Sequence, residues 1–162
     1  MADDVERLRP SKHIQKTVQK REERTPVEQA VARRKRTETF EKLKREMKNE
    51  AKLRRKDTGR DPVEYEGDAF DADRDSQMMV SDAITVAKRY NANNSDTWES
   101  TWKLEDGSFR SVTQQDLEAV FKKIEKQVES AYQREADING SIDSASTISD
   151  LEDIDMEVGW PS

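Results

Sequence analysis

The sequence predicts an α+β protein that is mostly helical, with a long basic amino-terminal helix and a small module of two β-hairpins packed on a long carboxy-terminal helix. Of its 162 residues, 40% are charged and 32% are hydrophobic, so only a small core can form. Two long stretches of helix-forming residues flank two short alternating segments that carry turn residues. We therefore expect a partly helical or flexible arm over 1–24, a charged helix over 25–58, the module over 61–156 and a tail over 157–162.

Charge is distributed unevenly along the chain. Residues 1–60 hold 20 Lys and Arg against 11 Asp and Glu, a net charge of +9, and residues 61–162 hold 9 against 24, a net charge of −15. Such asymmetry is typical of a chain whose two ends meet different surfaces, or whose copies attract one another. Two well-solvated surfaces without a partner preference are the alternative.

The composition argues against catalysis. There is no cysteine, which excludes disulfides, thiol nucleophiles and cysteine-ligated metals. The single histidine, His13, has no nearby group with which to form a nucleophile and base pair, and no glycine-rich phosphate loop or hydrolase elbow occurs. No apolar run is long enough to span a bilayer, and the acidic start is unlike a signal peptide. We expect a soluble, non-enzymatic protein without a cofactor or resident metal, made in a cytoplasm.

The basic helix has a clear start and stop. Thr25 is a hydroxyl cap, Pro26 occupies the first helical position and Glu28 completes a capping box. Nothing breaks the helix until about Lys56, and Gly59 is a plausible stop. Its apolar stripe is narrow, so the helix needs a neighbour; the stripe consists of Val27, Ala30, Val31, Phe40, Leu43 and Met47.

The same helix carries the predicted partner-binding residues. Its cations can contact an acidic protein surface, including the chain's own second half, or nucleic acid phosphates. Glutamates at three- and four-residue spacing dilute the positive field, which makes protein docking the favoured interpretation. With the terminal aromatic residue, which is either a frayed tail or an anchor on a neighbour, the predicted contacts are Arg33, Arg34, Lys35, Arg36, Phe40, Leu43, Met47 and Trp160.

The first hairpin and the helix after it are expected between residues 63 and 90. The hairpin has a turn at Gly67-Asp68 that places Tyr65 opposite Phe70. A helix over about 77–90 follows, capped by Asp75 or Ser76. Its expected apolar face consists of Met78, Met79, Ile84, Val86 and Ala87.

The second hairpin has the clearest strand signal. Apolar residues alternate with polar ones, and Asp106-Gly107 predicts a two-residue turn. That register pairs Leu104 with Phe109 on the face of Trp102. Aromatic residues gathered on one hairpin face are more typical of a core than of a ligand-stacking platform.

The last long helix begins at a capping box of Thr113 and Asp116 and is expected to run from Gln114 to Asn139, ending at Gly140. A second capping box over 147–150 predicts a short acidic helix. The expected core of the module is Tyr65, Phe70, Met78, Ile84, Trp98, Trp102, Leu104, Phe109, Leu117, Phe121, Ile124 and Val128.

One acidic run has the spacing of calcium ligands. Asp71, Asp73 and Asp75 match positions one, three and five of an EF-hand loop, with Asp82 at position twelve. Ser76 stands where that loop needs glycine, and no helix precedes the run. An acidic turn that caps the following helix is therefore the preferred interpretation.

The order of these elements resembles a phage domain family of unknown function encoded among tail and tail-fibre genes. Members read as a charged helix with arginines, a G-x-x-F/Y hairpin followed by Asp and Ser, a tryptophan hairpin and a closing helix. The resemblance covers about residues 38–158, and the basic arm 1–37 departs from the typical short member. The matching residues here are 65–73 with Ser76, Trp98, Trp102 to Phe109, and Thr113 to Leu117 with the helix that ends near Ile142.

The resemblance implies a role and a location. It suggests a virion structural or interaction protein of the tail, baseplate or tail-fibre region, made in the host cytoplasm. Its partners would be other tail, baseplate or fibre subunits, in a homo-oligomer or a larger assembly. An assembly chaperone that leaves the mature particle and a nucleic-acid-contacting adaptor are the alternatives.

Overall fold

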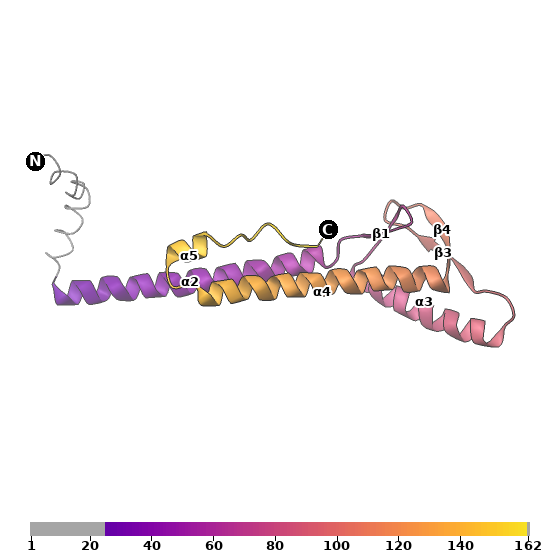
Figure 1. The fold of residues 1–162 in the computed structure, drawn as a ribbon, viewed down its shortest axis with the longest axis horizontal. Coiled ribbons are helices and arrows are strands. Elements are labelled where there is room, and N and C mark those ends of the chain that lie inside the picture. The colour runs from indigo at the N-terminus through magenta and orange to yellow at the C-terminus, as the bar shows by residue number, and fades with distance from the viewer. Residues whose placement is uncertain (1–24, 162) are drawn as a thin grey trace, which may run out of the picture. The chain divides into compact units, whose positions relative to one another are not determined.

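A computed structural model describes residues 25–161 of the chain. Figure 1 shows a mostly helical α+β fold with two small antiparallel hairpins and a long carboxy-terminal helix, which confirms the predicted fold class. The arm predicted over 1–24, with His13, lies outside the described residues. The elements are α2 (Pro26–Thr58), β1 (Val63–Tyr65), β2 (Asp68–Phe70), α3 (Arg74–Asn93), β3 (Glu99–Lys103), β4 (Phe109–Thr113), α4 (Gln114–Ser144) and α5 (Ile148–Glu152).

The chain divides into two compact units, Met1–Leu43 and Lys44–Ser162. The boundary falls inside α2, so the second unit begins at Lys44, whereas the module was expected over 61–156. In the first unit the structure describes residues 25–43, all in or directly before α2.

The predicted start of α2 is confirmed. The Thr25 hydroxyl accepts a hydrogen bond from the Glu28 amide at 3.3 Å, and the Glu28 carboxylate accepts one from the Thr25 amide at 2.8 Å. The helix ends at Thr58, and the buried Gly59 follows it with its amide bonded to the Arg55 carbonyl. A Cβ at Gly59 would lie 2.9 Å from that carbonyl oxygen, so any larger residue there would force the backbone to shift.

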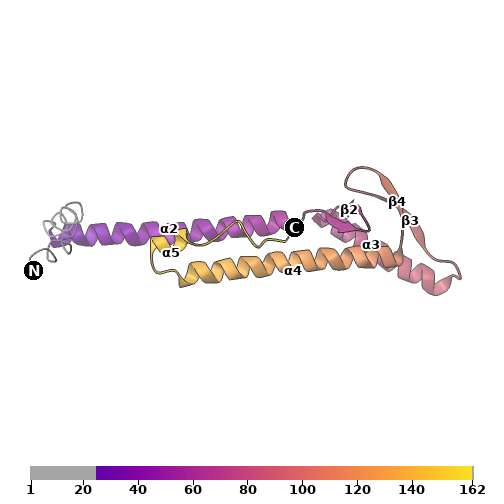
Figure 2. The same ribbon diagram turned by 45° about the horizontal axis from the view of Figure 1, so that its top comes forward.

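The second unit has its main core where both hairpins and α3 meet the amino-terminal half of α4 (Figures 1 and 2). Burial removes these side chains from water and supplies the main stabilising term. The buried members of this core are Val63, Phe70, Ala72, Val80, Ile84, Leu104, Val112, Leu117, Val120 and Ile124.

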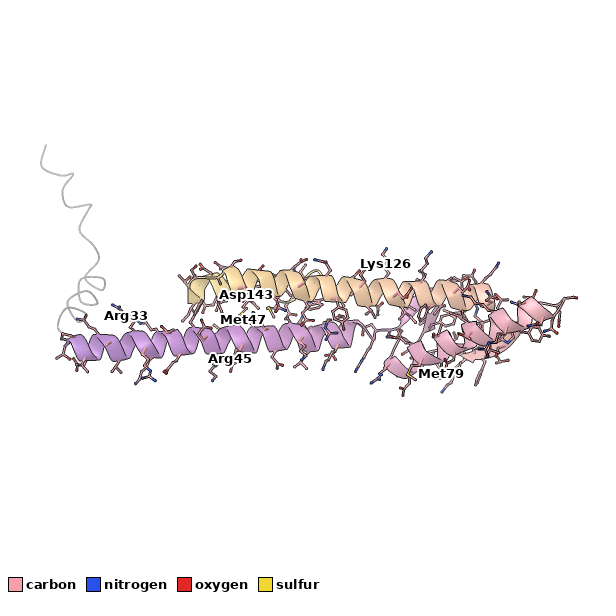
Figure 3. The ribbon with its side chains drawn as sticks, turned by 90° about the horizontal axis from the view of Figure 1, so that it is seen from below. Arg33, Arg45, Met47, Met79, Lys126 and Asp143 are labelled. Atoms are coloured by element: carbon pink, nitrogen blue, oxygen red, sulfur yellow. The ribbon has the colours of Figure 1, made fainter. Side chains whose placement is uncertain are left out.

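The carboxy-terminal part of α2 lies alongside α4 in the same unit (Figures 1 and 2). Ala51 is fully buried, which is consistent with a close approach of the α2 backbone to its neighbours. Met47 is half-buried on the side of α2 toward α4, whereas Arg45 points away (Figure 3). Further buried apolar residues on α4, after it and on α5 are Ala131, Ile138, Ile142, Ala145 and Leu151.

The turn of the first hairpin differs from the prediction. The register pairs Tyr65 with Asp68, so the turn residues are Glu66 and Gly67, with φ of 52° and 88°. Two positive φ angles define a turn that matches strand twist, and glycine adopts the second of them without strain. Tyr65 is not directly opposite Phe70, but their rings meet edge to face with centroids 6.2 Å apart.

The second hairpin is shifted by one residue from its expected register. Phe109 pairs with Lys103 and not with Leu104, and Trp102 pairs with Arg110. A longer turn causes the shift: the Gly107 amide bonds to the Leu104 carbonyl, and the Asp106 carboxylate accepts from the Ser108 amide. Because successive strand residues face opposite sides, Phe109 lies on the outer face and is 69% exposed. Its predicted place in the core was wrong.

Helix α3 begins earlier and buries a different face than expected. Its N-cap is Asp73, whose carboxylate accepts from the Ser76 amide at 2.7 Å, and not Asp75 or Ser76. The buried residues are Val80, Ile84 and Ala87, at spacings of four and three. Three residues predicted on the apolar face are instead exposed: Met78, Met79 and Val86.

Helix α4 begins as predicted but does not end at Gly140. Both hydrogen bonds of the Thr113–Asp116 capping box are present, and so are those of the Thr147–Asp150 box that starts α5. The helix continues to Ser144 because Ile142 becomes fully buried. That burial contributes about 1.5–3 kcal/mol, which offsets the roughly 1 kcal/mol that a glycine costs within a helix. No helix in residues 25–161 combines the length and apolarity needed to cross a bilayer.

Candidate interaction surfaces

The predicted partner-binding residues do not form one site, since they fall in both units. Arg33, Arg34, Lys35 and Arg36 lie in the first unit and are all exposed, and Phe40 and Leu43 there are half-buried. Within residues 25–161 the only ion pair of these four cations joins Arg34 to Glu38 at 2.9 Å, between side chains that are 84% and 62% exposed. Such an exposed pair contributes little to stability, and the positive charge of the segment is concentrated at residues 33–36.

The other two predicted contacts, Met47 and Trp160, lie in the second unit and are half-buried. The Trp160 indole N–H donates to the Met156 carbonyl at 2.9 Å. Its polar atom is therefore satisfied within the carboxy-terminal stretch.

Several cations of α2 that lie in the second unit pair with carboxylates from the acidic half of the chain. Lys48 Nζ lies 2.6 Å from Asp143 Oδ1, and Lys44 Nζ donates to the Asp143 carbonyl at 3.3 Å. The hydrogen bond from Lys48 lowers the pKa of Asp143. Arg54 pairs with Glu157, and the hydrogen bond that Arg54 donates to that carboxylate raises the pKa of Arg54. The opposite charges of the two halves are thus partly matched inside this unit.

Arg55 makes the most enclosed of these contacts. It pairs with Glu135, and the two side chains are only 16% and 18% exposed. Its guanidinium carbon also lies 4.2 Å from the centroid of the Tyr132 ring, a cation–π contact. These contacts fix the end of α2 against α4.

Gln127 is the one buried polar residue of the described chain. Its amide nitrogen donates to the Thr58 carbonyl at 2.9 Å and to the Asp61 carbonyl at 2.7 Å, which ties the segment after α2 to α4. Gln127 was not among the predicted functional residues. Its spacing of three from Ile124 and four from Ala131 places it on the apolar stripe of α4, and a polar residue there is the signal that could have found it.

A second network joins both hairpins to the start of α4. Arg110 of β4 pairs with Glu66, with Asp68 at 2.8 Å and more distantly with Asp116 at 4.0 Å. Tyr65 donates its hydroxyl to Asp116 at 3.0 Å, and Arg110 lies 5.4 Å from the Tyr65 ring centroid. Arg110 was not predicted either, because its partners lie on other elements.

The carboxylate of Asp116 is the centre of this network and should make stability depend on pH. Burial alone would raise the pKa of Asp116, but hydrogen bonds from Thr113 and Tyr65 and the charge of Arg110 together lower it. A lowered folded-state pKa stabilises the fold above the unfolded-state pKa, and this contribution is lost as pH falls. We expect Asp116→Asn to lower the free energy of unfolding by about 1–2 kcal/mol near neutral pH and by less near pH 3.

Chemical denaturation of wild type and D116N between pH 7 and pH 3 measures this difference. The charge-matched control is Asp82→Asn, which alters an exposed residue of α3. A wild-type advantage over D116N that stays constant over the whole pH range would contradict the assigned role of Asp116.

Within residues 25–161 no three His, Cys, Asp or Glu side chains are grouped so that they could hold a metal ion. In the acidic run 71–75, Asp73 caps α3 and its pKa is lowered mainly by the hydrogen bond from the Ser76 backbone. The preferred interpretation of this run as a helix cap is thereby confirmed.

Fold and surfaces together define a small helical α+β module whose distinctive features are charged surfaces. A family model described as a domain of unknown function (DUF4376) matches residues 41–157, and the chain belongs to this family. The match begins near the boundary between the two units and covers both hairpins, α3 and α4. Neither a curated protein nor a solved structure shows significant similarity to the chain.

Proposed function

We propose that the chain is a structural interaction protein that docks on an acidic surface of a neighbouring subunit through residues 25–43 of α2. The observation that carries this proposal is the contrast between two groups of cations on one helix. Those at Lys48, Arg54 and Arg55 have carboxylate partners within the second unit. Those at 33–36 are exposed, and only one of them has a carboxylate partner in the described chain.

The combination of exposed cations and exposed apolar side chains on this surface favours a protein partner. Exposed cations on a helix attract an acidic surface over a distance of about one Debye length, which raises the association rate and fixes orientation. Val27 and Val31 are 72% and 48% exposed on the same helix, and they supply apolar area that a partner can cover. A nucleic acid would use the charge but not these apolar side chains.

We further propose that the assembly is a phage tail, baseplate or fibre region, with the protein located in the virion. This part rests on the resemblance to phage domains encoded among tail genes, which typically lack the basic segment before residue 38. An added basic segment on an otherwise shared module suits attachment. An assembly chaperone, which binds the same subunits and then leaves, is the competing role.

Mass spectrometry of purified particles tests the location. We expect the protein in particles of the phage that encodes it, at a fixed ratio to a tail subunit. Stoichiometric copurification with a tail or fibre subunit from infected cells, with no protein in particles, would replace the virion role by the chaperone role. Affinity for a DNA duplex that falls steeply with salt would instead support nucleic-acid contact.

A further inference from the structure

A cavity of about 320 Å³ lies in the second unit, between the end of α2, the start of α3 and the middle of α4. Four cations line it, and no carboxylate does. Three of the four cations come from the basic first 60 residues of the chain, and one comes from the acidic remainder. The cations are Arg55, Lys56, Arg60 and Arg74, and Gln77 and Tyr132 also line the cavity.

Three of these cations form no ion pair in the described chain. Arg55 pairs with Glu135, but Lys56, Arg60 and Arg74 are exposed and form no ion pair within residues 25–161. Asp73 is an acidic group close enough to Arg60 for the two charges to interact, and its carboxylate is already occupied as the N-cap of α3. The cavity therefore holds like charges whose mutual repulsion an anion would relieve.

The walls of the cavity are held in place by contacts outside it. Glu135 and the Tyr132 ring fix the Arg55 guanidinium, and the Gln77 amide donates to the Ala72 carbonyl at 2.8 Å. Arg74 is the first residue of α3, whose amino end adds partial positive charge. An anion would thus meet partly preorganised donors, which lowers the entropy cost of binding.

We propose that this cavity binds the phosphate group of a small phosphorylated ligand. Guanidinium groups present planar pairs of N–H donors that match phosphate oxygens, and an ammonium group adds a point charge. Three cations without an ion-pair partner suit a group that carries about two negative charges better than one carboxylate. The volume lies at the lower end for small-molecule sites, which favours a compact ligand over a polymer.

Thermal unfolding of the full chain with inorganic pyrophosphate tests the proposal, with sodium chloride at equal ionic strength as the reference. We expect pyrophosphate at roughly ten times its Kd to raise Tm by about 2–5 °C. The double variant Lys56→Gln/Arg74→Gln should weaken binding by about tenfold or more. The matched control Lys103→Gln/Lys122→Gln changes two exposed cations that do not line the cavity and should keep the full shift.

The stability of the variants without ligand separates a binding site from a structural cluster. Because the changes remove repulsion, K56Q/R74Q should unfold at the wild-type temperature or above it. A lower Tm without ligand, or an equal pyrophosphate shift in wild type and K56Q/R74Q, would overturn the proposal. A shift with citrate as large as that with pyrophosphate would also overturn it, and so would a larger shift with a DNA oligonucleotide.

Discussion

Replacing Phe70 with Ala is expected to lower the free energy of unfolding by about 3–5 kcal/mol, the largest effect of any substitution considered. Phe70 is fully buried at the end of β2, in the core where both hairpins meet α3 and α4. Truncation removes apolar burial, leaves a cavity and deletes the edge-to-face contact with Tyr65. Urea denaturation followed by the fluorescence of the tryptophans measures the change.

Phe109 supplies the matched control for Phe70. The same Phe→Ala change at Phe109 should cost no more than about 0.5 kcal/mol, because this side chain is 69% exposed on the outer face of β4. A loss at Phe109 comparable with that at Phe70 would contradict the register of the second hairpin. It would support instead the register that pairs Leu104 with Phe109.

Gln127→Leu is expected to lower the free energy of unfolding by about 2–4 kcal/mol, although leucine has a similar size and a greater tendency to be buried. The substitution removes two hydrogen bonds and leaves the Thr58 and Asp61 carbonyls without that donor. Both hydrogen bonds are partly buried, and losing each of them costs about 1–2 kcal/mol. Denaturation midpoints of wild type and Q127L provide the measurement.

Gln133→Leu is the control for Gln127→Leu. Gln133 is exposed on α4, and its amide donates only to the neighbouring Asp137 carboxylate at 2.8 Å. We expect a change within about 0.5 kcal/mol. Equal effects at the two glutamines would mean that the contacts of Gln127 with the segment after α2 contribute little.

Features that depend on neighbouring residues were predictable from the sequence. The capping boxes at Thr25, Thr113 and Thr147 use hydrogen bonds across three residues, so the residue types suffice to identify them. The two hairpins were located by their turn residues and alternation. The register of the first was wrong because its two-residue turn lies one position earlier, at Glu66-Gly67, and that of the second because its turn is longer. Alternation alone fixes neither the position nor the length of a turn.

Features that depend on distant residues were not predictable at the level of individual contacts. In α3, Met79 and Val86 are as apolar as Val80 and Ile84, and only the position of α4 decides which face is buried. Figure 3 shows Met79 on the outside of this helix, away from α4. The chain's own acidic second half was one of the predicted partners of the basic helix, but the charge pattern could not pair Lys48 with Asp143 or Arg55 with Glu135.

The proposed docking surface consists of the exposed cations of the basic helix that lie before the cations with acidic partners in the second unit. The sequence showed one long basic helix, and the structure shows that several of its cations after Leu43 already have acidic partners in the second unit. Cations before that point, such as Arg33, remain exposed (Figure 3). The cations after Leu43 that have acidic partners therefore stabilise the module, and those before it are available to a partner.

Incorporation of charge-neutralised protein into particles tests this separation most directly. Under the proposed virion role, the variant R33Q/R34Q/K35Q/R36Q should fold with an unchanged Tm, and its amount in purified particles, measured by quantitative mass spectrometry, should fall about tenfold or more. The control R45Q/K52Q/K103Q/K122Q removes four exposed cations of the second unit and should be incorporated at the wild-type level. Equal incorporation of the two variants would contradict docking through residues 33–36.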